Sequence, residues 1–513
     1  MQIVTSAFSA EERDEVRQIS SNLQVAWKKD YKPTTKIFTI GSSAIGYSDT
    51  INSSGNVTSD WNKYLYEEES SNLVSAEWER ELNEPIGGIA KAQAGAKLNN
   101  TSGRYLPDYN GGTSALFTSV YLPRRPFIIN AGFNYNGVDN NIPQFIGITT
   151  KAPVINERDR TVQLQGTDFI NYLQNSYVDN AAIFTGLRSD QVIENLLINS
   201  GFSTSQYDLD YGINVIPFAE FNVGDRFGDI ISQIVQAENG YFWQTEEGIL
   251  KFQNRQAWTN SPYNQVQRII STAQVIEQVT PNTEHIINVV EVIAKPRAKQ
   301  PNQLVWKLSS SIEVPAKSTI EQFINYDDPM LAVNAPLYVA NTLSDSTGAD
   351  ATSFITIKKY DFARASKLKI TNSAPYTVFV TSMTIYGRPA KVINDIYFRE
   401  KRDASVTAFE ERPYKIENNY INSSVWANSF ANMVLDDYSQ PQKLIELTIK
   451  AIPELQLGDL ISWQGKYWRV WGIKSKLSAQ DGFIQELKLL QRNIITYFRI
   501  GISSIGGPDG IAP

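Results

Sequence analysis

The single histidine among the 513 residues, His285, limits the catalysis that this sequence could support. A zinc site of the HExxH type needs two histidines on one helical face. A Ser–His–Asp triad on a sharp turn needs a G-x-S-x-G motif, which does not occur in the sequence. His285 directly precedes the β-branched run at 286–290, so we interpret it as a residue at the edge of a strand. With no cysteine, the sequence also excludes thiolate nucleophiles, disulfides and Cys-bound metals.

Paired carboxylates are the catalytic chemistry that remains, because glycoside hydrolysis needs only two of them at a suitable separation. The candidates are Glu67, Glu68, Glu69, Glu77, Glu79, Glu246 and Glu247. Acidic residues in such runs are typical of solvated turns and strand faces, and we expect no catalytic pair among them. The sequence therefore predicts a protein that is not an enzyme.

Metal and nucleotide sites are also not expected. Asp208 and Asp210 begin like a calcium-binding loop, but Val215 and Glu220 fall at positions that do not complete the pattern. The sequence contains no G-x-x-x-x-G-K phosphate loop. We predict no metal, no cofactor and no catalytic residues.

Aromatic and arginine side chains are common anchors of protein interfaces. Several stand in strand-like contexts: Trp27, Trp61, Tyr64, Tyr66, Trp78, Arg124, Arg125, Trp463, Trp468 and Trp471. Each alone fits ordinary packing in a core. Together they suit a protein whose surfaces are mostly covered by neighbours.

Composition indicates a folded, modular and soluble chain. Hydrophobic residues make up 42% and charged residues 20%, which is near the average of folded proteins, and the length predicts three or four domains. The net charge of −7 disfavours a protein that grips nucleic-acid phosphates. No stretch is long and apolar enough for a transmembrane segment. The N-terminus lacks the apolar core of a secretory signal, so we expect synthesis in the cytoplasm.

Hydrophobic periodicity predicts mainly β structure with one α+β module. The first 165 residues alternate as antiparallel strands, for example at 73–80 and 160–165. Helices are expected from 189 to 201 and from 225 to 240, followed by a hairpin at 241–252. More strands follow from about 304, then a helix at 424–435 and a last β segment.

Two segments of the sequence resemble each other. Residues 126–165 and 458–489 both place a strand before Gly-Ile-x-x-Lys and an alternating strand after it. The likeness is short enough to arise by chance, or it reflects two related β domains. In the second case three chains, each with two such domains, would form a ring of six similar domains.

Three stretches together resemble the baseplate hub or tail-associated tip proteins of tailed bacteriophages. Ser75-Ala-Glu-Trp-Glu-Arg80, within 64–107, is similar to the opening barrel of these hubs. Ala237-Glu-Asn-Gly240, within 166–255, is similar to their middle module. Leu455-Gln-Leu-Gly458-Asp459 and Tyr467-Trp-Arg-Val-Trp471 are similar to their closing barrel. The resemblance covers about 60–490 and depends on the order and spacing of these motifs.

The resemblance implies two antiparallel, tube-like β-barrel domains, an α+β middle domain and an inserted β module. The division expected is 1–60 for an N-terminal extension, 61–165 for the first barrel, 166–255 for the middle domain, 256–303 for the start of the second barrel, 304–420 for an inserted or peripheral β module, 421–495 for the remainder of the second barrel and 496–513 for a flexible C-terminal tail.

The resemblance also implies a function. It describes a structural virion protein at the tail tip that forms a homotrimer, closes the distal end of the tail tube and opens for DNA to pass on infection. Its partners would be the distal tail protein ring, the tape measure protein and tail fibre or receptor-binding proteins. We further expect an acidic channel wall, to which DNA would not adhere.

Two other functions remain open at this stage. Aromatic-rich β modules also bind sugars, so a glycan-binding adhesin or tail fibre subunit is the second hypothesis. A cell-wall glycosidase that uses two of the carboxylates above is the third.

Overall fold

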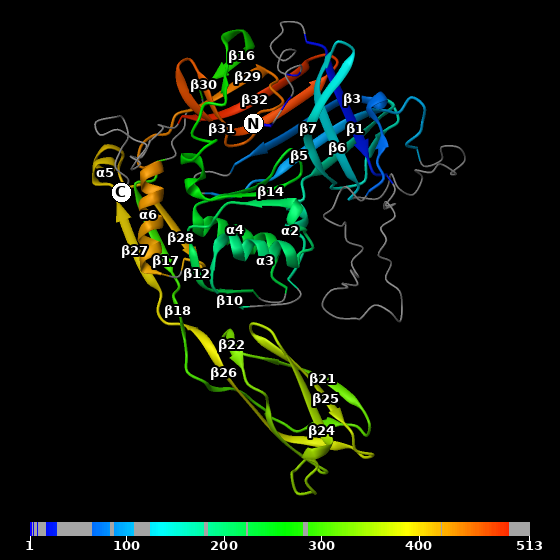
Figure 1. Cartoon of the computed structure of the whole chain (residues 1–513), viewed down its shortest axis with the longest axis vertical. Helices are drawn as coiled ribbons and strands as arrows, with labels where there is room; N and C mark the ends of the chain where they lie inside the picture. The colour runs from blue at the N-terminus through cyan, green and yellow to red at the C-terminus, as the bar shows by residue number, and fades with distance from the viewer. Residues whose placement is uncertain are drawn as a thin grey trace.

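The computed structural model describes residues 1–2, 4, 8, 17–27, 64–82, 87–106, 124–178, 183–221, 224–280, 286–421 and 423–491. His285, Trp61, the predicted C-terminal tail and most of the predicted N-terminal extension lie outside these residues. Strands dominate the described chain (Figure 1), which confirms the prediction of a mainly β protein with an α+β module.

The largest sheet combines strands from both ends of the chain (Figure 1). Its order is β16-β29-β32-β31-β3-β5-β9-β7-β6-β1-β2. The strands from the N-terminal part are β1 (Ile19–Val25), β2 (Glu67–Glu68), β3 (Leu73–Glu81), β5 (Ala92–Asn99), β6 (Pro126–Tyr135), β7 (Val138–Thr149) and β9 (Thr161–Thr167). Those from the C-terminal part are β16 (Val275–Val279), β29 (Leu444–Lys450), β31 (Lys466–Ser478) and β32 (Gly482–Gln491). The two predicted barrels are therefore two halves of one open sheet.

The two halves meet where β3 pairs with β31. The strands are antiparallel, from Ser75 opposite Ser478 to Glu81 opposite Gly472, and β3 pairs with β5 along its other edge. Pairing at an exposed edge satisfies backbone groups that would otherwise remain open to other chains. The backbone hydrogen bonds thus join the N-terminal and C-terminal halves directly.

The segments with similar sequence each supply neighbouring strands of this sheet, although in a different order relative to the junction of β3 and β31. Residues 126–165 supply β6, β7 and β9, and residues 458–489 supply β30 (Leu460–Trp463), β31 and β32. In both sets the strands are hydrogen-bonded neighbours. Relatedness of the two halves remains a prediction.

The middle module packs helices against small sheets, as the sequence predicts for 166–255. Helix α3 (Ser189–Asn199) and helix α4 (Phe227–Glu238) bury Ile193, Leu196, Ile231 and Ile234 in one core. Helix α4 ends at Asn239, whose left-handed φ of 52° suits a helix C-terminus. The hairpin of β13 (Tyr241–Gln244) and β14 (Leu250–Gln253) follows, as predicted.

The same core extends well beyond residue 255. Strand β17 (Val289–Ala294) pairs with β27 (Ile396–Lys401) and β28 (Pro413–Asn418). Helix α6 (Ser424–Tyr438) packs against β17 and β27 and shares the core of α3 and α4. We therefore propose that these elements belong to the middle module and not to the second β half.

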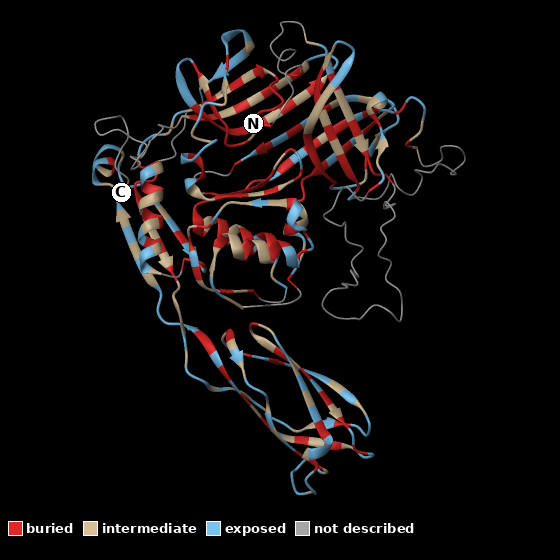
Figure 2. Cartoon of the chain, in the orientation of Figure 1, coloured by how far each residue is buried: buried red, intermediate tan, exposed pale blue. Residues whose placement is uncertain are grey.

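The inserted module is a two-sheet β structure that extends away from the rest of the chain (Figures 1 and 2). In one sheet the long strand β26 (Val378–Val392) pairs with β18 (Arg297–Lys299), β19 (Gln303–Lys307), β20 (Ile312–Val314), β22 (Met330–Val333) and β23 (Leu337–Asn341). In the other, β25 (Ala365–Asn372) lies between β21 (Thr319–Asn325) and β24 (Ile355–Asp361). Because β27 and β28 pair elsewhere, we propose module limits of 297–392 in place of 304–420.

One tight contact in the first β half generates a test of the packing. A Cβ on Gly166 would lie 2.2 Å from the Phe127 ring and 2.7 Å from the Ile148 carbonyl oxygen. On the neighbouring strand, a Cβ on Gly95 would meet nothing nearer than 3.5 Å. Gly166→Ala should destabilise the protein by about 1–3 kcal/mol because the core must shift to accept it. Gly95→Ala should leave the free energy of unfolding nearly unchanged, because the added Cβ has room. Urea unfolding of the two variants checks this, and equal stability would contradict the described packing.

Candidate functional site

A largely hydrophilic surface covers one side of the sheet across both halves, and we call it the polar face. Strand alternation turns Trp78 inward and Glu77, Glu79 and Glu81 outward. The polar face consists of Gln163, Gln165, Gln93, Lys97, Glu77, Glu79, Glu81, Lys474, Lys476, Glu486, Lys488, Glu446, Thr448 and Lys450. The set crosses the junction of β3 and β31. The same side of β32 also carries the partly exposed apolar residue Ile484, opposite Lys476 and Lys450.

The charges on the polar face pair across strands. Lys488 Nζ lies 2.7 Å from a carboxylate oxygen of Glu81, so this ion pair joins the two halves of the sheet. Lys476 pairs with Glu486 on the neighbouring strand. Acidic residues and lysines occur in equal numbers on this face, so it is hydrophilic without a strong charge of either sign.

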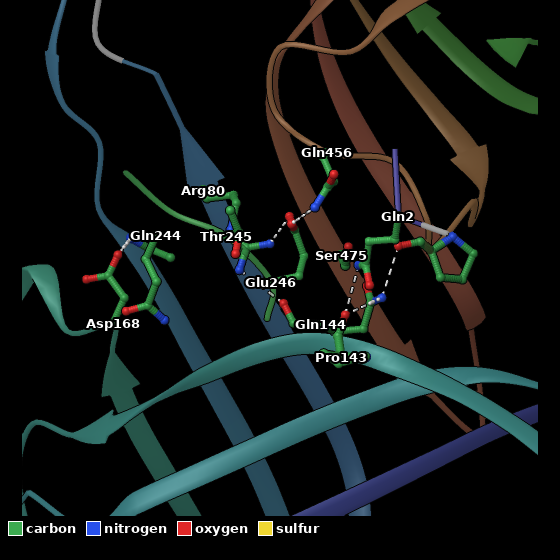
Figure 3. Close-up of polar contacts among 12 residues, drawn as sticks. Gln2, Arg80, Pro143, Gln144, Asp168, Gln244, Thr245, Glu246, Gln456 and Ser475 are labelled. Atoms are coloured by element: carbon green, nitrogen blue, oxygen red, sulfur yellow. Dashed lines mark hydrogen bonds and ion pairs between the residues drawn. The ribbon is translucent and has the colours of Figure 1, made fainter. Parts of the chain in front are cut away.

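A buried polar cluster holds the two β halves and the middle module together behind the sheet (Figure 3). The Arg80 guanidinium from β3 forms an ion pair with Glu246 from the β13–β14 turn, and both side chains are at most 5% exposed. Arg80 Nη2 also donates to the Gln144 carbonyl oxygen at 3.0 Å. Gln456 Nε2, before β30, donates to Glu246 Oε2 at 2.9 Å. One ion pair thus contacts all three parts of the chain.

Buried glutamine side chains complete this cluster. Gln244 Nε2 donates to the Ile146 carbonyl oxygen at 2.7 Å, and Gln244 Oε1 accepts from the Phe169 backbone N–H at 2.8 Å. Gln144 Nε2 donates to the Pro453 carbonyl oxygen at 3.0 Å. Buried polar groups that are satisfied in this way fix the relative position of the elements that carry them.

Two buried carboxyl groups flank the cluster. Burial raises the pKa of Asp168 to about 7, although its Oδ2 accepts from the Ala92 backbone N–H at 2.7 Å and Arg80 lies nearby. Burial also raises the pKa of Asp459 to about 6, against the attraction of the Met1 amino group, which donates to its Oδ1 at 2.7 Å. Both groups favour the protonated form more than an exposed aspartate does.

The carboxylates proposed for glycoside hydrolysis do not form a common site. Glu246 is a buried structural counter-ion, whereas Glu247 is exposed. Glu69 accepts a hydrogen bond from Trp27 Nε1 at 2.7 Å and one from the Tyr105 hydroxyl. The other candidates lie elsewhere: Glu67 pairs with Arg104, Glu68 accepts from Asn22, and Glu77 and Glu79 lie on the polar face.

A polar cavity of about 440 Å³ lies where the inserted module joins the middle module. Its lining includes Glu220, Asp225, Asp229 and Arg297. None of the glutamates considered for glycoside hydrolysis lines it. Glu220 forms ion pairs with Arg297 and with Arg364, which lies before β25 of the inserted module. These pairs tie the inserted module to its base.

Most of the other predicted anchors in the described residues pack inside the chain, whereas Arg124 is exposed and Tyr66 is partly buried. Trp471 packs edge-to-face against Tyr241 and Trp258, and Trp78 contacts Phe483. Trp27, Tyr64, Trp463 and Trp468 are buried, as is Arg125. The buried members of this set are core residues of one chain.

Within the described residues, no group of three or more histidine, cysteine or acidic side chains is arranged to hold a metal. In the same part of the chain, no helix has both the length and the apolar character of a membrane-spanning helix.

Sequence reasoning missed the structural use of Arg80. It occupies an inward position of the alternating run at 73–80, after Ala76 and Trp78. A charged residue at an inward strand position signals a buried partner, and this signal was present in the sequence.

The sequence matches no protein-family model, and none of the curated proteins is similar to it. The fold is similar to several solved structures. They include a tail protein from Neisseria meningitidis MC58, with 10% identity and a TM-score of 0.46 over 84% of this chain and 94% of that one. A 43 kDa tail protein of prophage MuSo2 from Shewanella oneidensis has 9% identity and a TM-score of 0.44 over 83% and 96%. Prophage tail protein gp18 from Listeria monocytogenes EGD-e has 10% identity and a TM-score of 0.39 over 84% and 93%.

Removing the charge of Glu246 should strongly destabilise the chain. Glu246→Gln leaves the buried Arg80 guanidinium without its counter-ion, and we expect a loss of about 3–5 kcal/mol in the free energy of unfolding. The neighbouring exposed side chain supplies the control, since Glu247→Gln should change stability by about 0.5 kcal/mol or less. Urea denaturation measures both. A similar small effect for the two variants would show that the ion pair does not hold the junction.

The raised pKa of Asp168 predicts a pH dependence with a definite sign. Between the ordinary value of 3.8 and about 7, the folded state binds more protons at this group than the unfolded state. Stability therefore falls as pH rises through this window. Asp168→Asn removes this titrating group. The melting temperature of the variant minus that of the natural protein should therefore be larger at pH 8 than at pH 5. The same difference in melting temperature at pH 5 and at pH 8 would contradict the raised pKa of Asp168.

Proposed function

We propose that this protein is a structural subunit of a phage-type tail tip, a baseplate hub that trimerises, closes the distal end of the tail tube and opens for DNA to pass. The observation that carries the proposal is the polar face, which crosses the junction of the two β halves and is polar apart from residues such as Ile484. The sequence motifs that resemble tail-tip hubs support the same function.

A hydrophilic sheet face of this extent suits the wall of a water-filled channel. The sheet buries its apolar side chains in two cores on the opposite side. Large rings of strands with a polar interior enclose aqueous channels. We therefore assign the polar face to the channel.

The charge pattern of this face differs from the acidic wall expected from the net charge. Its lysines are balanced by glutamates, and Lys476 and Lys488 form ion pairs on the face. Lysines with carboxylate partners attract phosphates less than unpaired lysines would. A neutral wall of this kind also allows DNA to slide.

Assembly into a ring would use the free ends of the sheet. β16 is the last strand at one end, and in the described chain it pairs with β29 alone. It exposes Ile276 at 58% and Val279 at 45%. An apolar edge strand of this kind is a site for pairing with another chain. Three chains, each with two β halves, would place six halves in one ring. Such a ring matches a hexameric tube.

The proposed hub acts mechanically and not as a catalyst. In the virion it would stack against the distal tail protein ring, contact the tape measure protein and present the inserted module to tail fibre or receptor-binding proteins. The ion pairs of Glu220 with Arg297 and Arg364 would keep that module in a fixed direction.

Charged side chains on the free edge should prevent assembly. The double variant Ile276→Lys and Val279→Lys should remain folded, because both side chains are largely exposed, and should change a three-chain mass into a one-chain mass. Light scattering coupled to gel filtration measures the mass.

Val215→Lys is the matched control, since Val215 is 55% exposed on the middle module away from this edge. It should leave the mass unchanged. A natural protein with the mass of one chain at micromolar concentration, or edge variants that still form trimers, would contradict the proposed assembly.

A further inference from the structure

The outer face of the sheet β21-β25-β24 in the inserted module carries an ordered set of side chains, and we call it the lysine–aromatic face. The strand register sets three rows across it. The rows are Thr319, Thr371 and Thr356; then Glu321, Lys369 and Lys358; then Phe323, Lys367 and Tyr360. Neighbouring rows lie about 7 Å apart along the strands, and neighbouring side chains in a row about 5 Å apart.

The opposite face of this sheet forms the core of the module. Ile324, Leu368, Ile370 and Ile355 are at most 4% exposed and pack against β26. The sheet is therefore covered on one side only. The lysine–aromatic face is directed to the outside of a module that already extends away from the rest of the chain (Figure 2).

This face is basic in a chain that is acidic overall. Residues 297–392 contain eleven basic and seven acidic side chains, a net charge of +4, whereas the whole chain has −7. Lys367 pairs with Glu321 at 2.8 Å. Lys358 and Lys369 form no ion pair within the described residues, so two ammonium groups of the face are available to an anion.

Two aromatic rings flank the central lysine. Phe323 is 59% exposed and Tyr360 is 46% exposed, and both share a row with Lys367. Lys367 Nζ lies 5.8 Å from the centre of the Phe323 ring. Exposed rings of this size cost free energy in water, which is recovered when a ligand covers them.

Hydroxyl groups occupy the remaining row. The Thr319 and Thr371 hydroxyls lie 2.9 Å apart and share a hydrogen bond. Together with the Glu321 carboxylate they offer both donors and acceptors beside the rings and lysines.

We propose that the lysine–aromatic face binds a phosphate-bearing polysaccharide. The rings would stack on the apolar faces of sugar rings, and the threonines and Glu321 would bond to sugar hydroxyls. The lysines would pair with phosphates, which lysine binds as a point charge. Single-stranded nucleic acid fits less well, because a carboxylate stands in the central row where every nucleotide would bring a negative charge.

The test uses the full chain and a defined probe, poly(glycerol phosphate) that carries glucose, in isothermal titration calorimetry at low salt. The natural protein should bind it. Removing the charges with Lys358→Ser, Lys367→Ser and Lys369→Ser should weaken binding at least tenfold, and removing the rings with Phe323→Ser and Tyr360→Ser should do the same. All eight positions of these variants and of the control variant are exposed or partly exposed, so the melting temperature should stay within a few degrees.

The control variant removes the same charge from the other sheet of the module, by Lys299→Ser, Lys307→Ser and Lys391→Ser, and should bind as the natural protein does. Neutral dextran and poly(glycerol phosphate) without sugar should bind at least tenfold more weakly than the probe. Equal loss of binding in the control variant would overturn the proposal. So would failure of the natural protein to bind the probe, or tighter binding of a 20-mer of dT. The mass of the assembly does not enter this test, so its outcome is independent of the proposed hub.

Discussion

The antiparallel pairing of β3 with β31 is the interaction on which the rest of the structure depends. It joins strands from opposite ends of the chain, so that Glu81 and Lys488, which form an ion pair, are 407 positions apart in sequence. On one side of the sheet the pairing makes the polar face continuous. On the other side it brings Arg80 over Glu246, where a buried ion pair and its glutamine neighbours link both β halves to the middle module. The same pairing therefore accounts for a hydrophilic surface and for a rigid interior.

The middle module contacts both β halves through the Arg80–Glu246 cluster and also carries the inserted module. Its core includes β17 and α6, which precede and follow the inserted module in sequence. Two chain crossings thus anchor the inserted module, and Glu220 adds ion pairs at its base. A rigid base is what allows a peripheral module to present one face in a constant direction.

The elements that the sequence predicts well are those with strong local periodicity. The alternation at 73–80, the helical stripes of α3 and α4 and the hairpin of β13 and β14 each depend on neighbours in sequence. The pairing of β3 with β31 could not be predicted, because alternation gives the face of a strand and not its partner. Helix α6 shows the same limit. Its stripe predicts a helix, yet its partner β17 is separated from it by the whole inserted module.

Glu246 shows why the site was harder to predict than the fold. The sequence marks it as a possible catalytic carboxylate, and the structure uses it as the counter-ion of Arg80. Both uses need a buried acidic residue, so residue type alone does not separate them. The inward position of Arg80 on β3 is the observation that would have favoured the structural use.

Electron cryomicroscopy of the purified full chain tests the central claim most directly. The account predicts a threefold assembly around an open or plugged channel, with Glu79 of β3 and Lys474 of β31 directed toward the axis. An isolated chain, or an assembly in which the face of β3 and β31 points to bulk solvent on the outside, would contradict it.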